Sequence, residues 1–363
     1  MTESTQVLPK AKKSVALSGT AAGNTAICTV GRTGNDLNYR GYDILDLADK
    51  CEFEEIAHLL IHHKLPTASE LKAYKAKLKA LRGLPLPVKA VLEQIPAAAH
   101  PMDVMRTAVS TLGCVLPEKD DHNSAGARHI ADRLIASLGS MLLYWYHYSH
   151  NGKRIEVETD DESIGGHFLR LLHGERPSEL HVRSMHTSLV LYAEHEFNAS
   201  TFTARVIAST RSDMVSAVTG AIGAMKGPLH GGAPGPVLDM LLEIKTVENA
   251  EPWVRAELAA GRRIMGFGHR VYKVRDPRAA VLAKVAEEMG GARMQDRALF
   301  DLARTVEKTA LRVLEEVKPG RNLQTNVEFY TALVLQSLGL APNTFVALFA
   351  CGRAAGWAAH VIE

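Results

Sequence analysis

Cysteine is scarce in this chain of 363 residues, and its spacing excludes the functions that depend on paired thiols. The four cysteines, Cys28, Cys51, Cys114 and Cys351, are scattered, and no Cys-x-x-Cys pair occurs. Neither a disulfide framework nor a zinc ribbon is suggested by this pattern. We therefore expect reduced thiols and a cytoplasmic protein.

An excess of charge of either sign is also missing. The chain has 42 Lys and Arg against 40 Asp and Glu, a net charge of +2, and no long basic block. Proteins that bind nucleic acid concentrate basic residues on one face. We therefore expect no nucleic-acid partner.

No apolar run was found that is long enough to cross a membrane. The most apolar stretch, around Leu134–Tyr148, is interrupted by Ser137, Ser140 and His147. A membrane-spanning helix needs about 20 consecutive apolar residues. We therefore expect a soluble protein with no membrane partner.

Three loop motifs of common enzyme classes are absent. No Gly-x-Gly-x-x-Gly follows a strand pattern, and neither a Walker loop nor a Gly-x-Ser-x-Gly elbow occurs. These motifs support dinucleotide binding, phosphoryl transfer on a P-loop and serine hydrolysis, respectively. The chemistry of this chain must come from other residues.

Helical periodicity dominates what is present. In Phe53–Ile61 the apolar residues follow one stripe, and Thr67 or Ser69 would cap a helix that opens after Pro66. Only Asn24–Asp46, where turn residues separate short apolar runs, predicts β structure. The fold class is therefore mainly α, with a small N-terminal β hairpin. Further helices are expected at Pro87–Gln94, Pro101–Leu112, Ala125–Tyr148, Ser178–Ala193, Thr201–Ala208, Asp213–Ala224, Pro234–Ile244, Trp253–Ala260, Pro277–Glu288, Asp296–Val317, Val327–Leu338 and Thr344–Val361.

A change in composition near residue 226 predicts two domains. Glycine and proline punctuate Lys226–Pro236, and the residues that follow carry most of the glycine-flanked polar sites. We expect a large helical domain of residues 1–225 plus 331–363. A small helical domain of residues 226–330 would carry most of the active site.

Two histidines stand in glycine-rich breaks. His230 lies in Gly227-Pro-Leu-His-Gly-Gly232, before a helix expected to start near Pro234. A helix N-terminus favours a neutral imidazole and an anionic ligand. His269 ends Gly266-Phe-Gly-His269. Taken alone, a glycine-flanked histidine is more often an ordinary loop residue.

Charged residues nearby change that balance. Arg278 ends Arg275-Asp-Pro-Arg278 at a helix start, and a guanidinium is the natural partner of a substrate carboxylate. Glu328 begins an apolar helix. The alternative is that its negative charge only stabilises the positive end of the helix dipole. Together, imidazoles, a carboxylate and arginines suit proton transfer beside an anionic substrate.

His195 is a third candidate, flanked by Glu194 and Glu196 and followed by a polar run that suits orienting a polar ligand. A metal site is the alternative, because imidazole and carboxylate groups are common metal ligands. Adjacent residues on a helix point apart, so one ion could not easily use all three. We expect no metal.

These motifs resemble those of the citrate synthase family in order and spacing. The resemblance covers the chain from about Ser14 onward. The part before Lys226 resembles 2-methylcitrate synthases in particular, whereas the part after it is closer to citrate synthases of other bacterial branches. The residues that carry the resemblance are Tyr39–Asp43, Gly227–Gly232, Gly266–Arg278, Asn326–Tyr330 and Gly352–Trp357.

The resemblance implies a mainly helical homodimer whose two domains close over the substrates. By position, His230, His269 and Glu328 would be catalytic. Glu328 would remove a proton from the carbon next to the acyl-CoA thioester, and His230 would stabilise the enol oxygen. His269 would assist at the oxaloacetate carbonyl.

The resemblance also implies the binding residues. His195, Arg278 and Arg353 would hold oxaloacetate. No permanently bound cofactor is implied, because the acyl-CoA is a co-substrate. The residues implied to line the CoA path are Arg263, Ile264, Met265, Gly266, Phe267, Lys273 and Asn326, with Arg40 on the adenine side.

The expected reaction is condensation of propionyl-CoA with oxaloacetate and water to give 2-methylcitrate and CoA. A citrate synthase that uses acetyl-CoA, or an enzyme with both activities, is the alternative, because one methylene is worth only about 1–3 kcal/mol in a pocket. A ligand-binding relative without activity is a third reading, since most family members have Asp where this chain has Glu328.

Overall fold

The computed structural model describes residues 22–32, 34–116, 124–231, 234–269, 272, 274–291 and 294–363. Within these ranges the chain is mainly helical, as the sequence predicts. The α-helices are α1 (Ile44–Lys50), α2 (Phe53–His62), α3 (Ala68–Ala80), α4 (Leu86–Gln94), α5 (Pro101–Val115), α6 (Ser124–Asn151), α7 (Ile164–His173), α8 (Glu179–Tyr192), α9 (Ala199–Ser209), α10 (Met214–Met225), α11 (Pro234–Ile244), α12 (Ala250–Ala259), α13 (Pro277–Gly290), α14 (Met294–Val317), α15 (Val327–Ser337) and α16 (Phe345–Ile362); the 3-10 helices are η1 (Val247–Asn249) and η2 (Pro342–Thr344).

A small antiparallel sheet near the N-terminus confirms the predicted β segment. Strands β1 (Cys28–Val30), β2 (Leu37–Tyr39) and β3 (Tyr42–Asp43) are ordered β1-β2-β3. The hydroxyl of the fully buried Tyr39 lies 3.2 Å from the backbone nitrogen of Glu194 and donates to the carbonyl of Val190 at 3.0 Å. This contact fixes the sheet beside the end of α8.

Most of the expected helices form with ends within a few residues of the predicted ones. Thr67 is the N-cap of α3, and its hydroxyl accepts the backbone N–H of Glu70. Two helices, α1 and α7, were not expected. Helix α7 contains Gly165 and Gly166, and glycine weakens a helical pattern in the sequence. Tertiary packing explains the first of these, since a Cβ on Gly165 would lie 3.2 Å from Cγ of Met185 on α8.

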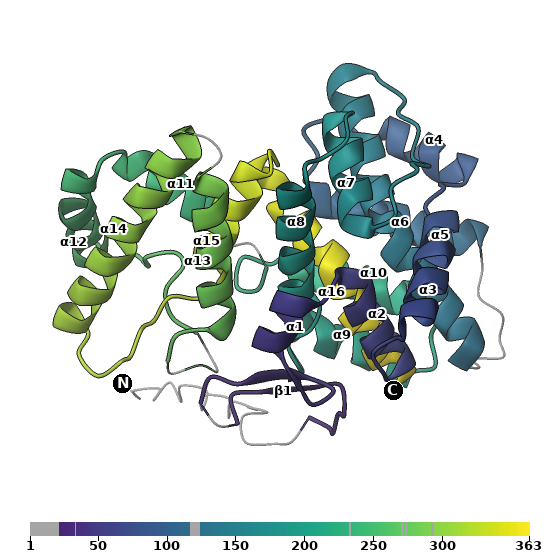
Figure 1. The fold of residues 1–363 in the computed structure, drawn as a ribbon, viewed down its shortest axis with the longest axis horizontal. Helices are drawn as coiled ribbons and strands as arrows, with labels where there is room; N and C mark the ends of the chain where they lie inside the picture. Colours follow the sequence, from purple (N-terminus) through teal and green to yellow (C-terminus); the bar gives the residue numbers. More distant parts are fainter. Residues whose placement is uncertain are drawn as a thin grey trace, which may run out of the picture.

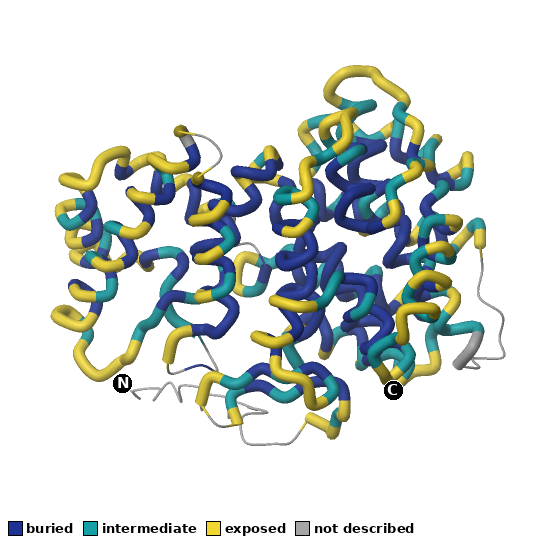
Figure 2. The backbone as a smooth tube through the Cα atoms, in the orientation of Figure 1, coloured by how far each residue is buried: buried dark blue, intermediate teal, exposed yellow. Residues whose placement is uncertain are grey.

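Figure 1 shows the helices in two groups, with α11–α15 on the left and α1–α10 on the right. Helix α16 begins between the two groups and runs into the right-hand one, and Figure 2 shows that most of its length is buried. The expected domain boundary after residue 330 falls inside α15 (Val327–Ser337), so a division there would cut a helix. The two-domain organisation stays a prediction.

The expectation that no segment is long and apolar enough to cross a membrane was wrong. Residues Pro342–Ile362, which contain α16, meet both criteria, and 89% of the most apolar window is buried inside the protein. Packing against α2, α6, α8, α9 and α10 makes α16 the central core helix. The apolar stretch Leu134–Tyr148 lies within α6, where Leu134, Leu138 and Trp145 are also buried.

Glycines let α16 approach α8 closely. A Cβ on Gly356 would lie 2.2 Å from the carbonyl oxygen of Ala193 and 2.2 Å from Oε2 of Glu194, so any side chain there would collide. The close approach places Arg353, one turn earlier on α16, beside the turn that follows α8.

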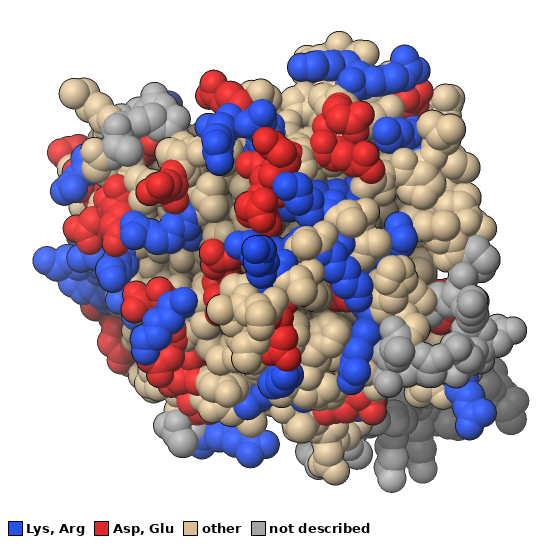
Figure 3. All heavy atoms as spheres, turned by 45° about the vertical axis from the view of Figure 1, so that its right-hand side comes forward, with Lys and Arg blue, Asp and Glu red and all other residues tan. Residues whose placement is uncertain are grey.

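Acidic and basic side chains are interspersed over the face shown in Figure 3. Many are paired; Glu316 on α14, for example, binds Arg255 on α12 at 2.6 Å and Arg312, one turn earlier on α14, at 2.9 Å. This mixture accords with the net charge of +2.

Candidate active site

One cavity of about 460 Å³ gathers the predicted catalytic and oxaloacetate-binding residues. Each comes from a different part of the chain. The lining contains His195 after α8, His230 after α10, His269 in the loop after α12, Arg278 at the start of α13, Glu328 at the start of α15 and Arg353 on α16, together with Asn326.

A short backbone pairing places the His269 loop beside the start of α15. Phe267 and Thr325 form an antiparallel bridge, and the N–H of Asn326 donates to the carbonyl of Gly266 at 3.0 Å. Gly266 has φ +85°, and a Cβ there would lie 2.7 Å from the ring of Phe329. Glycine is therefore required at this position for both its backbone conformation and its close contact.

Glu328 occupies the first turn of α15, two residues after the N-cap residue Asn326, whose side-chain oxygen accepts the N–H of Glu328 at 3.2 Å. Burial raises the pKa of Glu328 above its ordinary value, and the nearby guanidinium of Arg278 opposes that rise. A carboxylate with a raised pKa is a stronger base. The position suits Glu328 to proton abstraction inside the cavity.

His230 is fixed by the start of α9. The N–H of Ser200 donates to Nε2 of His230 at 3.2 Å, and the Ser200 hydroxyl lies 2.7 Å from the same nitrogen. Trp357 Nε1 donates to that hydroxyl at 3.0 Å. Because Nε2 accepts, the proton of a neutral ring is on Nδ1. The helix N-terminus that contacts His230 in the described residues is thus that of α9, whereas the sequence pointed to α11.

His195 and His269 lie close together, with ring centroids 5.3 Å apart. Burial, followed by the positive charge of Arg278, lowers the pKa of His195 well below its ordinary value, so the ring is neutral. Its Nε2 is buried without a hydrogen-bond partner in the described residues. The N–H of Tyr272 donates to Nδ1 of His269 at 3.2 Å, which places the proton of a neutral His269 on Nε2.

The surroundings of His195 differ from those expected. His195 follows the end of α8, so it lies in a turn and not on a helix. Oε1 of Glu194 accepts the N–H of His195 at 2.8 Å and lies 3.1 Å from Nε2 of His360. Glu194 therefore bonds to the backbone and to His360 on α16. Among the described residues, Glu194, His195 and Glu196 do not form a group that could hold a metal ion.

Two arginines give the cavity its positive charge. Asp276 binds Arg278 through Nε at 3.0 Å and Nη2 at 2.8 Å, with both side chains buried. Arg353 donates from Nε to the carbonyl of Tyr192 at 2.5 Å and lies 5.0 Å from the ring centre of Phe349. Burial lowers the pKa of Arg353 to about 10, so it stays charged at neutral pH. Two guanidinium groups suit a substrate with two carboxylates.

The residues predicted to bind CoA are less closely gathered. Asn326 lines the cavity. Gly266 and Phe267 belong to the loop that pairs with Thr325, the residue before Asn326. Ile264 is buried, Met265 is half-buried and Arg263 is exposed. Arg40 donates to the carbonyl of Leu60 at 2.9 Å and does not line the cavity. Lys273 lies outside the described residues. These assignments stay predictions.

Sequence reasoning missed the residues that hold the site in place. Asp276 lies within the Arg275–Arg278 motif, so its partnership with Arg278 could have been inferred from the spacing. Ser200 lies in the polar run after His195, but its contact with His230, 30 residues away, has no local signal.

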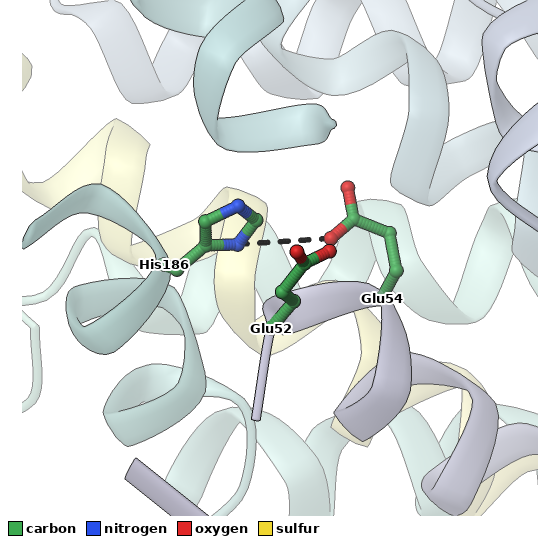
Figure 4. Close-up of side chains that lie close together, drawn as sticks. All are labelled: Glu52, Glu54 and His186. Carbon is green, nitrogen blue, oxygen red and sulfur yellow. Dashed lines mark ion pairs between the residues drawn. The ribbon is translucent and has the colours of Figure 1, made fainter. Parts of the chain in front are cut away.

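One group of side chains in the described residues has the composition of a metal site, apart from the cavity. Ligand atoms of Glu52, Glu54 and His186 lie within 4.8 Å of one another (Figure 4). Nδ1 of His186, 3.6 Å from Glu54, accepts the N–H of Phe53 at 3.1 Å. The ammonium of Lys75 binds Glu52 at 2.5 Å. The backbone N–H of Ile164 also donates to Glu54. All three groups therefore have partners within the protein, and the geometry gives no support for a metal.

The helical fold and a cavity that gathers a buried carboxylate, imidazoles and guanidinium groups are suited to acid–base chemistry on a dianionic substrate. Residues 16–363 match the family description "Citrate synthase, C-terminal domain". The chain belongs to the citrate synthase family and is an acyl-CoA:oxaloacetate C-acyltransferase that carries out citrate-synthase-type condensation.

Individual relatives agree with this assignment. The chain is 48% identical to 2-methylcitrate synthase of Shewanella oneidensis over 96% of this chain and 90% of that protein. It is 38% identical to citrate synthase 2 of Bacillus subtilis over 96% of this chain and 91% of that protein. A ternary complex of carboxymethyl coenzyme A and oxaloacetate with citrate synthase from Thermoplasma acidophilum superposes with a TM-score of 0.88, at 30% identity, over 96% of this chain and 91% of that chain.

Proposed function

We propose that this enzyme condenses propionyl-CoA with oxaloacetate and water to give 2-methylcitrate and CoA. The observation that carries the choice of acyl group is the 48% identity to a 2-methylcitrate synthase, against 38% for a citrate synthase aligned over an equal share of this chain. The cavity supports the chemistry, because it combines a buried carboxylate, three imidazoles and two guanidinium groups.

In the first step Glu328 takes a proton from the carbon next to the thioester carbonyl. The raised pKa of Glu328 favours this transfer. As negative charge develops on the thioester oxygen, the Nδ1–H of His230 donates to it, since Ser200 keeps Nε2 as an acceptor. An enol or enolate forms.

In the second step the enol carbon attacks the ketone carbon of oxaloacetate. His195, Arg278 and Arg353 hold the substrate, two of them through its carboxylates. The Nε2–H of His269 donates to the ketone oxygen, which becomes the hydroxyl of the product. Water then cleaves the thioester, which releases CoA as a thiol and leaves a third carboxylate on the product.

Citrate synthesis from acetyl-CoA is the second candidate. The motifs after Lys226 resemble those of citrate synthases, and citrate synthase 2 of B. subtilis is covered over 91% of its length. The two thioesters differ by one methylene, which gives discrimination of only about 10–200-fold in a pocket. Activity with both substrates, with propionyl-CoA preferred, is the expected outcome.

We further propose a cytoplasmic homodimer with a small domain in each subunit that begins near residue 226. Phe202 and Val206 on α9 remain 39% and 50% exposed in the single chain, close to Ser200 at the cavity. Apolar side chains on one helix face favour burial by a second copy. Sedimentation equilibrium should give a dimer mass, and Val206→Glu should shift the equilibrium toward the monomer.

Release of free thiol tests the proposed reaction. Purified enzyme is mixed with oxaloacetate and either propionyl-CoA or acetyl-CoA, with Glu328→Gln as the control for background hydrolysis. The proposal expects a higher kcat/KM with propionyl-CoA. Equal or better values with acetyl-CoA would support the second candidate. Absence of thiol release with both, beside a thermal shift with oxaloacetate, would indicate a ligand-binding relative without activity.

A further inference from the structure

A single carboxylate, that of Glu307 on α14, accepts hydrogen bonds from three residues in two segments that border the active site. Its Oε1 accepts from Nη2 of Arg275 at 3.0 Å and from the hydroxyl of Thr325 at 2.7 Å. Its Oε2 accepts from the hydroxyl of Tyr330 at 2.5 Å. Glu307 is 8% exposed and does not line the 460 Å³ cavity.

The three donors bracket residues that we assign to the reaction. Thr325 directly precedes Asn326, the N-cap of α15, and Tyr330 follows Glu328 by two positions. Glu307 therefore holds the chain on both sides of the proposed base. The first turn of a helix frays easily unless its ends are fixed by such contacts.

Arg275 links the same carboxylate to the oxaloacetate side. It directly precedes Asp276, which binds Arg278 along one edge. The N–H of Asp276 also lies 3.3 Å from the carbonyl of Thr325. The segment of the substrate arginine and the segment of the base are thus fixed to each other and to α14.

We infer that Glu307 is a positioning residue that sets the placement of Glu328 and of the Arg275–Arg278 segment at the same time. This inference rests on the proposed function. Hydrogen bonds to an ionised carboxylate are shorter and about twice as strong as neutral ones. Since a misplacement of about 1 Å can cost about a hundredfold in rate, loss of these bonds affects catalysis and not only stability.

The individual donors separate the two effects. Thr325→Val and Tyr330→Phe each remove one bond beside Glu328 and keep the side-chain shape, so kcat should fall by about tenfold, with the KM for oxaloacetate nearly unchanged. Arg275→Gln should raise the KM for oxaloacetate by about tenfold with a smaller change in kcat. Glu307→Gln should alter both parameters.

Glu316→Gln is the matched control. Glu316 is also on α14, is 45% exposed and binds Arg255 and Arg312, and none of the three lines the cavity. Its loss should leave kcat and KM within about twofold of the wild type. A purely structural role for Glu307 predicts that Glu307→Gln, Thr325→Val and Tyr330→Phe lower the melting temperature while kcat and KM stay at wild-type values. That result would overturn the inference.

A binding measurement keeps this test separate from that of the reaction. If the wild type releases no thiol from either acyl-CoA, the proposed function fails. Titration calorimetry with oxaloacetate alone still reports on the arginine segment, where Arg275→Gln and Glu307→Gln should weaken binding by about tenfold and Glu316→Gln should not. Unchanged affinity in all three variants would contradict the role of Glu307 independently.

Discussion

Asp276 holds the guanidinium of Arg278 along one edge, through bonds of 3.0 and 2.8 Å, and this leaves the rest of the group to the cavity. Both side chains are almost fully buried. The pair therefore keeps a positive charge in place without requiring a substrate. It explains how a dianion can be bound inside the protein at modest cost in stability.

Arg278→Lys should weaken oxaloacetate binding. A lysine keeps the charge but cannot bind Asp276 and a carboxylate in the forked manner of a guanidinium. Loss of a charged hydrogen bond corresponds to about 1.5–3 kcal/mol, or about 10–100-fold in the KM for oxaloacetate. Steady-state kinetics with saturating acyl-CoA measure this change. An unaltered KM would place oxaloacetate elsewhere.

Glu328→Gln should lower kcat by about 10²–10⁴-fold, the range expected for loss of a general base. The amide has nearly the same shape, and burial already disfavours the charged form of Glu328, so the melting temperature should not fall. Glu328→Asp shortens the side chain by one methylene and should retain part of the activity. Comparable rates for Glu328→Gln and the wild type would show that another group removes the proton.

Ser200→Ala should reduce kcat by about tenfold while the KM for oxaloacetate stays close to the wild-type value. The hydroxyl lies 2.7 Å from Nε2 of His230, and its loss frees the ring to turn away from the thioester oxygen. Trp357, which donates to the same hydroxyl at 3.0 Å, would also lose its partner, so stability should fall slightly. Kinetics and thermal melting of the variant separate the two effects. A rise in KM alone would contradict this assignment.

Stability should fall in acid, in part through His167. This ring is 1% exposed and lies 3.0 Å from the hydroxyls of Ser140 and Thr159. Burial, aided by Arg82, lowers the pKa of His167 to about 3. An unfolded histidine has a pKa of about 6.5, so below that pH the unfolded chain binds the extra proton first. The contribution of the neutral His167 ring to the free energy of unfolding is complete above about pH 6.5 and is lost as the pH falls toward 3.

His167→Gln removes this titration and should flatten the decline of unfolding free energy between pH 6.5 and 4, measured by urea denaturation. Carboxylates and other buried histidines also contribute to the wild-type slope, so the informative quantity is the difference between the two proteins. Parallel curves would show that His167 does not hold a depressed pKa.

The sequence motifs located most of the cavity because the chemistry is concentrated in short glycine-containing breaks. His230, His269, Arg278 and Glu328 each lie in such a break or at a helix start, and the structure brings them together. Gly266 shows why the breaks contain glycine, since its positive φ and its contact with Phe329 exclude a side chain. Their catalytic roles remain proposals until the variants are measured.

The supporting residues could not be found in this way. Ser200 lies at the start of α9 and His230 in the loop after α10, and only the tertiary fold brings them together. Glu307 is likewise far in sequence from Arg275 and Thr325, so no local pattern predicts their contact. Helix α16 was recognised as helical, but its position at the centre of the molecule depends on packing against helices from distant parts of the chain.

A competition assay tests the central claim most directly. Equal concentrations of propionyl-CoA and acetyl-CoA are supplied with limiting oxaloacetate, and the products are separated by mass. Their initial ratio equals the ratio of the two kcat/KM values, without separate rate measurements. The account predicts that 2-methylcitrate exceeds citrate, by up to about 200-fold for a pocket that accommodates one further methylene. Citrate in equal or greater amount would contradict it.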